Sequence, residues 1–351
     1  MNTYILSKEE SDRLNILKYI AIIFVVYIHS YATEVNFANG TNNLFLPQWL
    51  LLFENFISKT ISQCGVPLFF LISSILLFKK KRNYKATIKE KIRTLLLPYL
   101  IWNSLWILVF ILLQNLNFTS AYFSSDNVPI LQSSFSELLE LYGVGLHLPY
   151  PQDYPLWFMR DLMLIILCFP IIEKFINKFP KQVLFITVLL LFVPVKFPLK
   201  QALLWFCLGA CIVKFQKHIT FFDNTSLWIF SFIYIVGAVV ALILDNSIIN
   251  VLFTFLGIIY WVRMSKLIFD KQKLRRIFLQ LSKWTFIIYV AHELTLTSLK
   301  KICLKLLPTT PIWLLIEYIF IPIVVIIGCI AVGKVFKKIA PQVYSISTGS
   351  R

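Results

Sequence analysis

The sequence predicts an all-α, polytopic membrane protein with about ten transmembrane helices and both termini in the cytoplasm. Its 351 residues are 58% hydrophobic and only 15% charged, whereas soluble domains average about 45–50% apolar and about 25% charged residues. Apolar runs of spanning length recur along the whole chain. Lys and Arg gather in alternate connections between these runs. No soluble domain or internal repeat is evident, so residues 1–351 are predicted to form a single transmembrane domain.

Apolar runs of roughly 17–23 residues predict spanning helices, because about 20 residues cross the ~30 Å hydrocarbon core of a bilayer. Ten such runs are predicted, at 15–33, 61–78, 94–116, 156–172, 182–197, 200–214, 226–244, 248–265, 284–299 and 312–333. The fifth and sixth runs are short and only KFPLK separates them, so the count is open at this point. The first run is long enough to be a permanent span rather than a cleaved signal.

The positive charges orient the chain and limit its partners. Most of the 34 Lys and Arg residues lie in connections on one side, which the positive-inside rule makes cytoplasmic. The exceptions are Lys59, Arg160, Lys196, Lys200, Lys300, Lys301 and Lys305. Because the net charge of +17 is spread between apolar runs rather than gathered on one soluble face, it argues against a nucleic-acid partner.

The cysteines favour no metal site. All six lie in or beside apolar segments, where a small apolar side chain is the usual role of cysteine. Cys207 and Cys211 share a helix face, but two thiols without further ligands make a poor metal site. No metal is therefore expected.

The first run carries an ionisable residue at each end of its apolar core. Lys18 precedes the core and His29 ends it. Eleven helical steps separate the two residues by about 16 Å along the axis, roughly half of the ~30 Å core. An ionisable side chain at this depth is costly, which indicates a functional site. The alternative is a histidine that hydrogen-bonds to a neighbouring helix as a packing contact.

The second run and the connection after it combine close packing with positive charge. Gly65 and Pro67 predict an irregular start to the second helix, and the small residues Ser73 and Ser74 favour close helix contact. The connection 79–93 is the most basic in the chain. It either retains positive charge on the inner side with anionic lipid or binds the phosphates of a polyanionic cofactor.

Within this basic connection, Lys89 and Arg93 are the candidates for phosphate binding. They are four residues apart and so share a helix face directed toward the membrane entry.

The longest connection, 117–155, is predicted to lie outside the cytoplasm. It contains SFSELLELYG, which predicts a short amphipathic helix. Loops of this length often act as lids or binding loops. Its aromatic residues suit either stacking on a sugar or anchoring at the membrane interface; they are Tyr122, Tyr142, His147, Tyr150 and Tyr154.

Two later runs carry polar residues inside the membrane. Arg160 and Asp161 lie one turn inside the fourth run. Adjacent helical residues do not face each other, so each is expected to have its own partner. The ninth run places His292 near mid-membrane, next to Glu293, with Tyr289 on the face of His292. Such residues predict a polar cavity inside the bundle.

Two further residues of note lie within apolar runs. Gly209 in the sixth run is expected to permit close helix packing. Glu317 in the tenth run either adds to the polar cavity or extends outward to the membrane surface.

Five patches together resemble the membrane-bound acyltransferase 3 family, the bacterial inner-membrane O-acyltransferases. Each patch alone is weak, but they occur in the family's order across residues 13–292. They are a basic residue, ten residues and a histidine in RLNILKYIAIIFVVYIH (Lys18 and His29), VPLFFLIS at 66–73, KEKIRTLLLPYLIW at 89–102, PLWFMRDLML at 155–164 and SKWTFIIYVAH at 282–292.

The resemblance implies a multi-pass protein of the bacterial cytoplasmic membrane. It would move an acyl group, usually acetyl, from acyl-CoA, usually acetyl-CoA, to a hydroxyl of an extracytoplasmic glycan or lipid-linked saccharide. The family often has Arg where this chain has Lys18, which keeps the charge but loses bidentate phosphate binding. The resemblance includes no SGNH-type esterase domain, so the membrane domain itself or a separate protein would complete the transfer. A homodimer is left open.

The resemblance also implies roles for the polar residues. The donor's phosphates would bind Lys18, Lys89 and Arg93 at the cytoplasmic mouth. His29 would act as general base on the acceptor hydroxyl, and an acyl-histidine intermediate remains the alternative. Arg160 is the candidate for stabilising the oxyanion.

The remaining candidates support this centre. Asp161 or Glu34 would orient His29, and His292 would complete the cavity or position the donor. Glu34, Trp157 and Tyr289 are the candidates for acceptor binding.

Two other functions compete with acyl transfer. A proton-coupled transporter or flippase of a glycan or small anion would use the same buried His, Asp and Glu as a proton relay. Inverted repeats are common in such proteins, and no convincing repeat is evident here. A non-catalytic sensor or scaffold would not need two histidines at mid-membrane depth.

Overall fold

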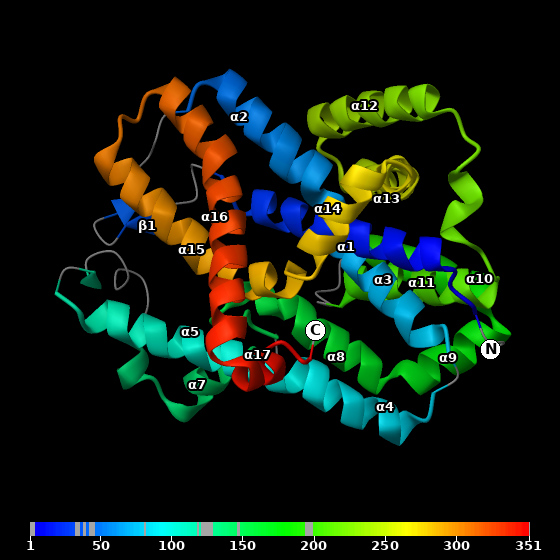
Figure 1. Cartoon of the computed structure of the whole chain (residues 1–351), viewed down its shortest axis with the longest axis horizontal. Helices are drawn as coiled ribbons and strands as arrows, with labels where there is room; N and C mark the ends of the chain where they lie inside the picture. The colour runs from blue at the N-terminus through cyan, green and yellow to red at the C-terminus, as the bar shows by residue number, and fades with distance from the viewer. Residues whose placement is uncertain are drawn as a thin grey trace. The chain divides into compact units, whose positions relative to one another are not determined.

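The computed structural model describes residues 4–31, 36–37, 40–41, 46–80, 82–117, 119–120, 129–145, 148–193 and 199–350 (Figure 1). Three residues with predicted roles lie outside these ranges: the acceptor residue Glu34 and the loop aromatics Tyr122 and His147. The chain divides into two compact units. The first unit holds 1–28, 55–89 and 164–285, and the second holds 29–54, 90–163 and 286–351. The single domain expected over 1–351 stays a prediction.

The first unit is built from helices and short helical turns. Its elements are α1 (Lys8–Ile28), η1 (Asn55–Thr60), η2 (Ile61–Cys64), α3 (Gly65–Phe78), α9 (Phe169–Lys178), α10 (Pro180–Phe192), α11 (Lys200–Lys214), η6 (Ile219–Phe222), α12 (Leu227–Leu244), α13 (Ser247–Asp270) and α14 (Gln272–Ser282). Helices α4 (Tyr84–Lys91) and α8 (Trp157–Leu167) contribute residues to both units.

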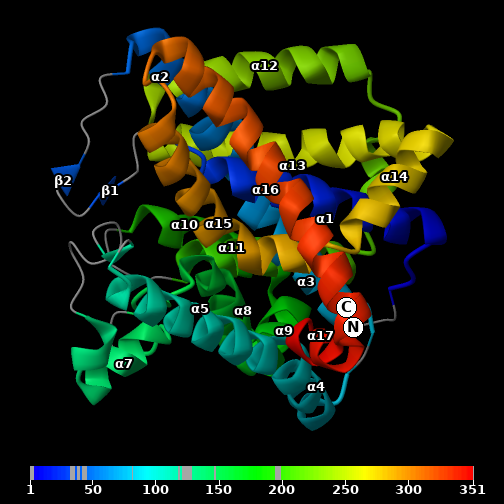
Figure 2. The same cartoon turned by 60° about the vertical axis from the view of Figure 1, so that its left-hand side comes forward.

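The second unit is helical apart from one small ladder. Two-residue strands β1 (Asn36–Phe37) and β2 (Gly40–Thr41) pair antiparallel, with Asn36 opposite Thr41. Its helical elements are α2 (Gln48–Glu54), η3 (Ile92–Leu96), α5 (Leu97–Asn115), η4 (Ile130–Gln132), α7 (Phe135–Leu141), η5 (Tyr154–Leu156), α15 (Thr285–Leu306, from its second residue), α16 (Pro311–Ile339) and α17 (Pro341–Ser347). Figure 2 shows α17 at the end of the long α16.

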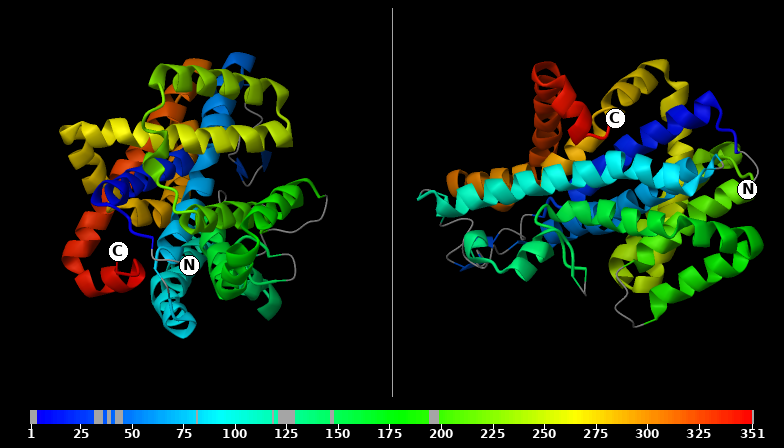
Figure 3. Two further views of the ribbon diagram at one scale, coloured as in Figure 1. Left: turned by 90° about the vertical axis from the view of Figure 1, so that its right-hand side faces the viewer. Right: turned by 90° about the horizontal axis from the view of Figure 1, so that it is seen from below.

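Among the described residues, five helices are long and apolar enough to cross a membrane. They match the predicted spans at 61–78, 94–116, 226–244, 248–265 and 312–333, of which only residues 116 and 226 fall outside the helices. The five helices run over Gln48–Phe78, Tyr84–Asn115, Leu227–Leu244, Ser247–Asp270 and Pro311–Ile339. Figure 3 (right) shows Tyr84–Asn115 as one long cyan helix. These helices confirm an all-α protein of the membrane-spanning type.

The fourth predicted span is bent rather than straight. Tyr154–Leu167 and Phe169–Lys178 together are apolar enough to count as a sixth span, but their axes meet at 64°. Pro170 lies in the first turn of α9. A proline there lacks the amide hydrogen that would continue the preceding helix, which accounts for the break.

The helices at the other four predicted spans are not both long enough and apolar enough to count as membrane-crossing. Ten spans and cytoplasmic termini therefore stay predictions. The helix α1 ends at Ile28, before the predicted end of the first span. Helices α10 and α11 have 13 and 15 residues, which at ~1.5 Å per residue fall short of a ~30 Å core. The helix α15 carries Glu293 and Lys300 within its length.

Close approach of α3 and α11 organises the first unit (Figure 1). A Cβ on Gly209 would lie 2.6 Å from the Leu71 carbonyl oxygen and 2.8 Å from the Ser74 Cβ. The Ser74 hydroxyl donates to the Phe206 carbonyl at 2.6 Å. The predicted close packing at Gly209 and Ser74 is confirmed.

A buried arginine ties α1 to the rest of the first unit. The Arg13 side chain is fully buried and donates two bonds to Asp223, at 2.6 and 2.9 Å. Its Nε donates to the Ser265 hydroxyl at 3.0 Å, and its Nη2 donates to the Val262 carbonyl at 2.9 Å. The bidentate pair and two further acceptors satisfy a charge that would otherwise be costly to bury.

The loop before α8 contains the short helix that the sequence predicts. Ser134 caps α7 by accepting from the Glu137 amide at 3.4 Å, and its own amide donates to the Glu137 carboxylate at 2.6 Å. These reciprocal bonds form a capping box. The helix carries the chain toward Gly143 and Pro149, whose carbonyls contact Arg160.

Candidate functional site

The candidate site lies in the second unit and centres on His29, which directly follows α1 in the sequence. The hydroxyl of Tyr154, the first residue of η5, makes a hydrogen bond with the His29 Nδ1. The two rings meet edge to face, with centroids 4.9 Å apart and planes at 86°. A partner on Nδ1 orients an imidazole and decides which nitrogen keeps a lone pair.

The structure brings the two predicted histidines side by side. The rings of His29 and His292 lie 5.6 Å apart between centroids, at an angle of 32°. His292 is fully buried in α15, and its Nδ1 lies 3.0 Å from the Ile288 carbonyl and 2.9 Å from the Tyr289 carbonyl. Because carbonyls only accept hydrogen bonds, Nδ1 carries the proton. The Nε2 of His292 therefore keeps its lone pair, and it has no hydrogen-bond partner among the described residues.

Lys300 adds a cation that the sequence analysis did not assign to the site. Its Nζ donates to the His29 carbonyl at 3.2 Å, and the residue is buried. Two signals pointed to it: Lys300 is among the cations outside the basic connections, and it follows His292 by eight residues on the same helix. A spacing of eight returns close to the same helix face.

Arg160 and Asp161 pair with each other, which corrects the expectation that each has its own separate partner. The Nε of Arg160 donates to the Asp161 Oδ1 at 2.9 Å, and its Nη2 forms an ion pair with the same oxygen at 2.9 Å. The rule for adjacent helical residues concerns the directions of Cβ atoms, and the long arginine side chain folds back far enough to reach the neighbouring carboxylate.

The rest of the Arg160 guanidinium holds the loop before α8. Its Nη1 donates to the carbonyls of Leu148, at 3.0 Å, and Pro149, and lies 3.5 Å from that of Gly143. Gly143 has φ of +66°, and a Cβ there would lie 3.2 Å from Nη1. A glycine avoids strain at this left-handed position. In this arrangement Arg160 positions the loop, and its oxyanion role stays a prediction.

Asn103 and Asp153 form a second buried connection that the sequence analysis missed. The Asn103 side chain donates to the Leu141 carbonyl at 2.8 Å and accepts from the Asp153 amide at 3.0 Å. Burial, together with the nearby Glu293 carboxylate, raises the pKa of the Asp153 carboxyl well above its usual value. An amide inside the apolar run 94–116 was the available signal.

Tyr289 contacts the backbone that carries Tyr154. Its hydroxyl donates to the Pro155 carbonyl at 2.7 Å, and its ring meets Phe158 edge to face at 6.0 Å. Trp157 is half-buried at the start of α8. Acceptor binding by Tyr289 and Trp157 stays a prediction.

The predicted donor-binding residues lie on three different elements, α1, α4 and η3. Lys18 is half-buried, and its Nζ donates to the Asn15 side chain at 3.2 Å. Lys89 is exposed on α4 in the first unit, and Arg93 is exposed on η3 in the second. The helix has π-type bonding at η3, which adds residues per turn and alters the α-helical spacing on which their shared face was predicted. A common phosphate site stays a prediction.

Comparison with known proteins adds family evidence to this geometry. The family described as "Acyltransferase domain", acyltransferase 3, matches residues 11–333. The succinoglycan biosynthesis protein ExoH of Rhizobium meliloti (strain 1021) is 28% identical over 179 residues, which cover 50% of this chain and 45% of that protein. The match therefore spans less than half the length of this relative. No solved structure matches the chain.

Proposed function

Because the chain belongs to the acyltransferase 3 family, we propose that it moves an acetyl or other short acyl group from acyl-CoA to a hydroxyl of a cell-surface glycan or lipid-linked saccharide. The observation that carries the proposal is the pair of neighbouring imidazoles in the second unit, one of them held by Tyr154. The relative named for succinoglycan biosynthesis supports a polysaccharide acceptor.

His29 is the general base of the proposed reaction. When its Nδ1–H donates to the Tyr154 oxygen, its Nε2 is free to accept a proton. Nε2 takes the proton of the acceptor hydroxyl while the oxygen attacks the thioester carbonyl. The tetrahedral intermediate then expels the CoA thiolate, which takes the proton from the imidazolium. The products are the O-acyl ester and CoA thiol, and an acyl-histidine route uses the same atoms in two steps.

The donor binds from the cytoplasmic side of a bacterial cytoplasmic membrane in this proposal. Lys18, Lys89 and Arg93 are the proposed phosphate contacts, and the exposure of Lys89 and Arg93 in a basic stretch supports them. Among the described residues no group of three His, Cys, Asp or Glu side chains could hold a metal ion. The mechanism above uses the acyl donor as its co-substrate.

The test is acetyl transfer by the purified full-length chain. We expect radiolabel from acetyl-CoA to appear on extracted surface glycan, and His29→Ala to lower the rate by about 10²–10⁴-fold, which is the usual contribution of a general base. His218→Ala is the matched control, because His218 bonds to Glu10 in the first unit. Full transfer by His29→Ala would contradict the proposal. Proton-coupled uptake without use of acetyl-CoA would favour a transporter.

A further inference from the structure

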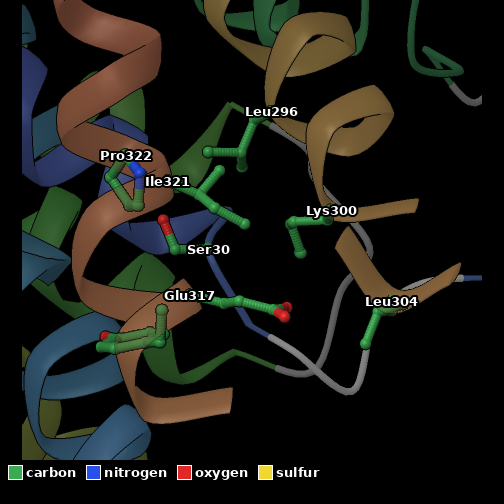
Figure 4. Close-up of a pocket in the computed structure, with 8 residues that line it drawn as sticks. Ser30, Leu296, Lys300, Leu304, Glu317, Ile321 and Pro322 are labelled. Carbon is green, nitrogen blue, oxygen red and sulfur yellow. The ribbon is translucent and has the colours of Figure 1, made fainter. Parts of the chain in front are cut away.

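The space beside Glu317 in the second unit is small. For Glu317 the sequence leaves open a place in the polar cavity or an outward direction, and the residue is only 7% exposed. Figure 4 shows its carboxylate pointing into a space between α15 and α16, which Ser30 and Lys300 also line. This space has room for about one water molecule. A larger partner does not fit there.

The helix α14 lies on the surface of the first unit, at the end of a helix of spanning length. None of its residues is buried, and it follows α13 after the single extended residue Lys271. Figures 2 and 3 (left) show α14 running across the end of α13 rather than continuing along it. Because α13 is long and apolar enough to cross a membrane, a helix that runs across its end lies near the plane of the membrane surface.

One face of α14 packs on the first unit. The Phe278 ring meets the Tyr19 ring of α1 edge to face, with centroids 5.7 Å apart. Arg275 pairs with Asp12 of α1 at 2.5 Å, and its guanidinium lies 4.1 Å from the centre of the Phe269 ring. Residues 275 and 278 are three apart and so share a helix face. The residues on the other faces of α14 are mostly exposed.

These other faces carry an apolar row beside a basic row. The apolar row consists of Leu274 and Ile277, which are three residues apart and 37% and 39% exposed. The basic row consists of Lys273, Arg276 and Lys283, all exposed, at spacings of three and seven that keep them on one face. Exposed apolar residues beside a basic face are typical of a helix that lies in the membrane interface.

The basic row has no acidic partner in the protein. The stretch 271–283 contains no Asp or Glu, and Asp270 before it pairs with Lys266 at 2.9 Å. Within the part of the chain that the structure describes, the three cations of the row make no ion pair. Lys and Arg bind phosphate through charge-assisted hydrogen bonds. At a membrane surface, such a row favours anionic over zwitterionic phospholipid.

We propose that α14 is an interfacial helix that binds anionic phospholipid. Leu274 and Ile277 enter the boundary between headgroups and acyl chains. The cations of the basic row contact the lipid phosphates, and their aliphatic stems lie along the apolar row. The helix thereby anchors the first unit to the leaflet that it faces, which the distribution of Lys and Arg predicts to be the cytoplasmic one. This surface is separate from the proposed site of acyl transfer, and the inference does not depend on that function.

Fluorescence quenching in nanodiscs tests the depth of the helix. In the full-length chain without its native cysteines, a bimane label is attached at Ile277→Cys or, as the matched control, at Gln280→Cys, which is exposed on the basic face. We expect lipids that are spin-labelled near the headgroup to quench position 277 at least about threefold more strongly than position 280, because only the apolar row enters the bilayer. Aqueous iodide should give the opposite order. Equal quenching of both positions by lipid would overturn the inference.

A second measurement tests the charge of the lipid. With the label at position 277, spin-labelled phosphatidylglycerol should quench about fivefold more strongly than spin-labelled phosphatidylcholine at the same mole fraction, which is the preference expected from one cation at the surface. Replacing all three cations of the basic row by Gln should bring this ratio close to one. The matched control exchanges Lys for Arg and Arg for Lys at the same three positions and should keep the ratio. A ratio of one with the native basic row would contradict the proposal.

Free CoA distinguishes a lipid from the acyl donor, since both carry phosphate. At constant ionic strength, CoA in the aqueous phase should leave the preference for phosphatidylglycerol unchanged. Loss of the preference on addition of CoA would assign the basic row to the donor and remove the lipid site.

Discussion

At the scale of single residues, the hydrogen bond between Tyr154 and His29 is the contact with the most direct chemical consequence. An imidazole acts as a base only through a nitrogen that has a lone pair, and the partner of the other nitrogen decides which one that is. Tyr154 occupies Nδ1, so in the proposed reaction the phenol would act through His29 as a positioning residue.

The variant Tyr154→Phe tests this role. It removes the hydroxyl and keeps the ring, so we expect kcat to fall about tenfold or more while the KM for acetyl-CoA stays unchanged. Steady-state kinetics with varied donor concentration would measure the two separately. Tyr150→Phe, at an exposed position in the same loop, is the control. A raised donor KM with unchanged kcat in Tyr154→Phe would contradict a positioning role.

At the scale of elements, the contact of α3 with α11 shows how small residues permit close helix packing. At Gly209 the two backbones approach so closely that a methyl group would overlap the Leu71 carbonyl. The Ser74 hydroxyl bonds to the facing helix at the same level. The first unit depends on this contact because α3 also packs against α1.

The variant Gly209→Ala should therefore destabilise the protein. Overpacking a close contact typically costs about 1–3 kcal/mol, which outweighs the gain of up to about 1 kcal/mol in helix propensity. The expected result is a lower Tm in detergent. Gly328→Ala is the matched control, because a Cβ there meets nothing within 4 Å. If both variants melted at the wild-type temperature, the close contact would not be important for stability.

At the scale of the whole molecule, the distribution of Lys and Arg predicts the orientation in the membrane. The prediction is that the 117–155 loop lies outside and the basic 263–283 connection lies inside. Within the described ranges, five helices, or six with the bent pair, have the length and apolarity to span a membrane. The packing of these helices does not decide which of their ends faces the cytoplasm.

Cysteine labelling tests the orientation. In a background without the six native cysteines, a membrane-impermeant maleimide should label Glu137→Cys in intact cells, and Lys273→Cys only after permeabilisation. Both positions are exposed, so accessibility depends on the side of the membrane. Transfer activity of the cysteine-free background serves as the control for folding. The opposite labelling pattern would reverse the orientation.

The fold was largely predictable because a spanning helix depends on local composition. The apolar runs at 61–78, 226–244, 248–265 and 312–333 became helices of spanning length, since each satisfies its own backbone bonds. The break in the fourth run was harder to predict from the sequence. Pro170 marked it, but the 64° bend also depends on what surrounds the helix.

The site was only partly predictable. The sequence by itself determined a helical membrane protein with ionisable residues at His29 and His292, because burying such groups in an apolar run is costly and hence informative. Only the tertiary structure decided their partners: Tyr154 on His29, Asp161 on Arg160, and Lys300 beside the His29 carbonyl. The physical reason is that the free-energy cost of burying an ionisable side chain can be judged from the apolar run in which the residue lies. A hydrogen bond, in contrast, depends on distances between segments far apart in the chain.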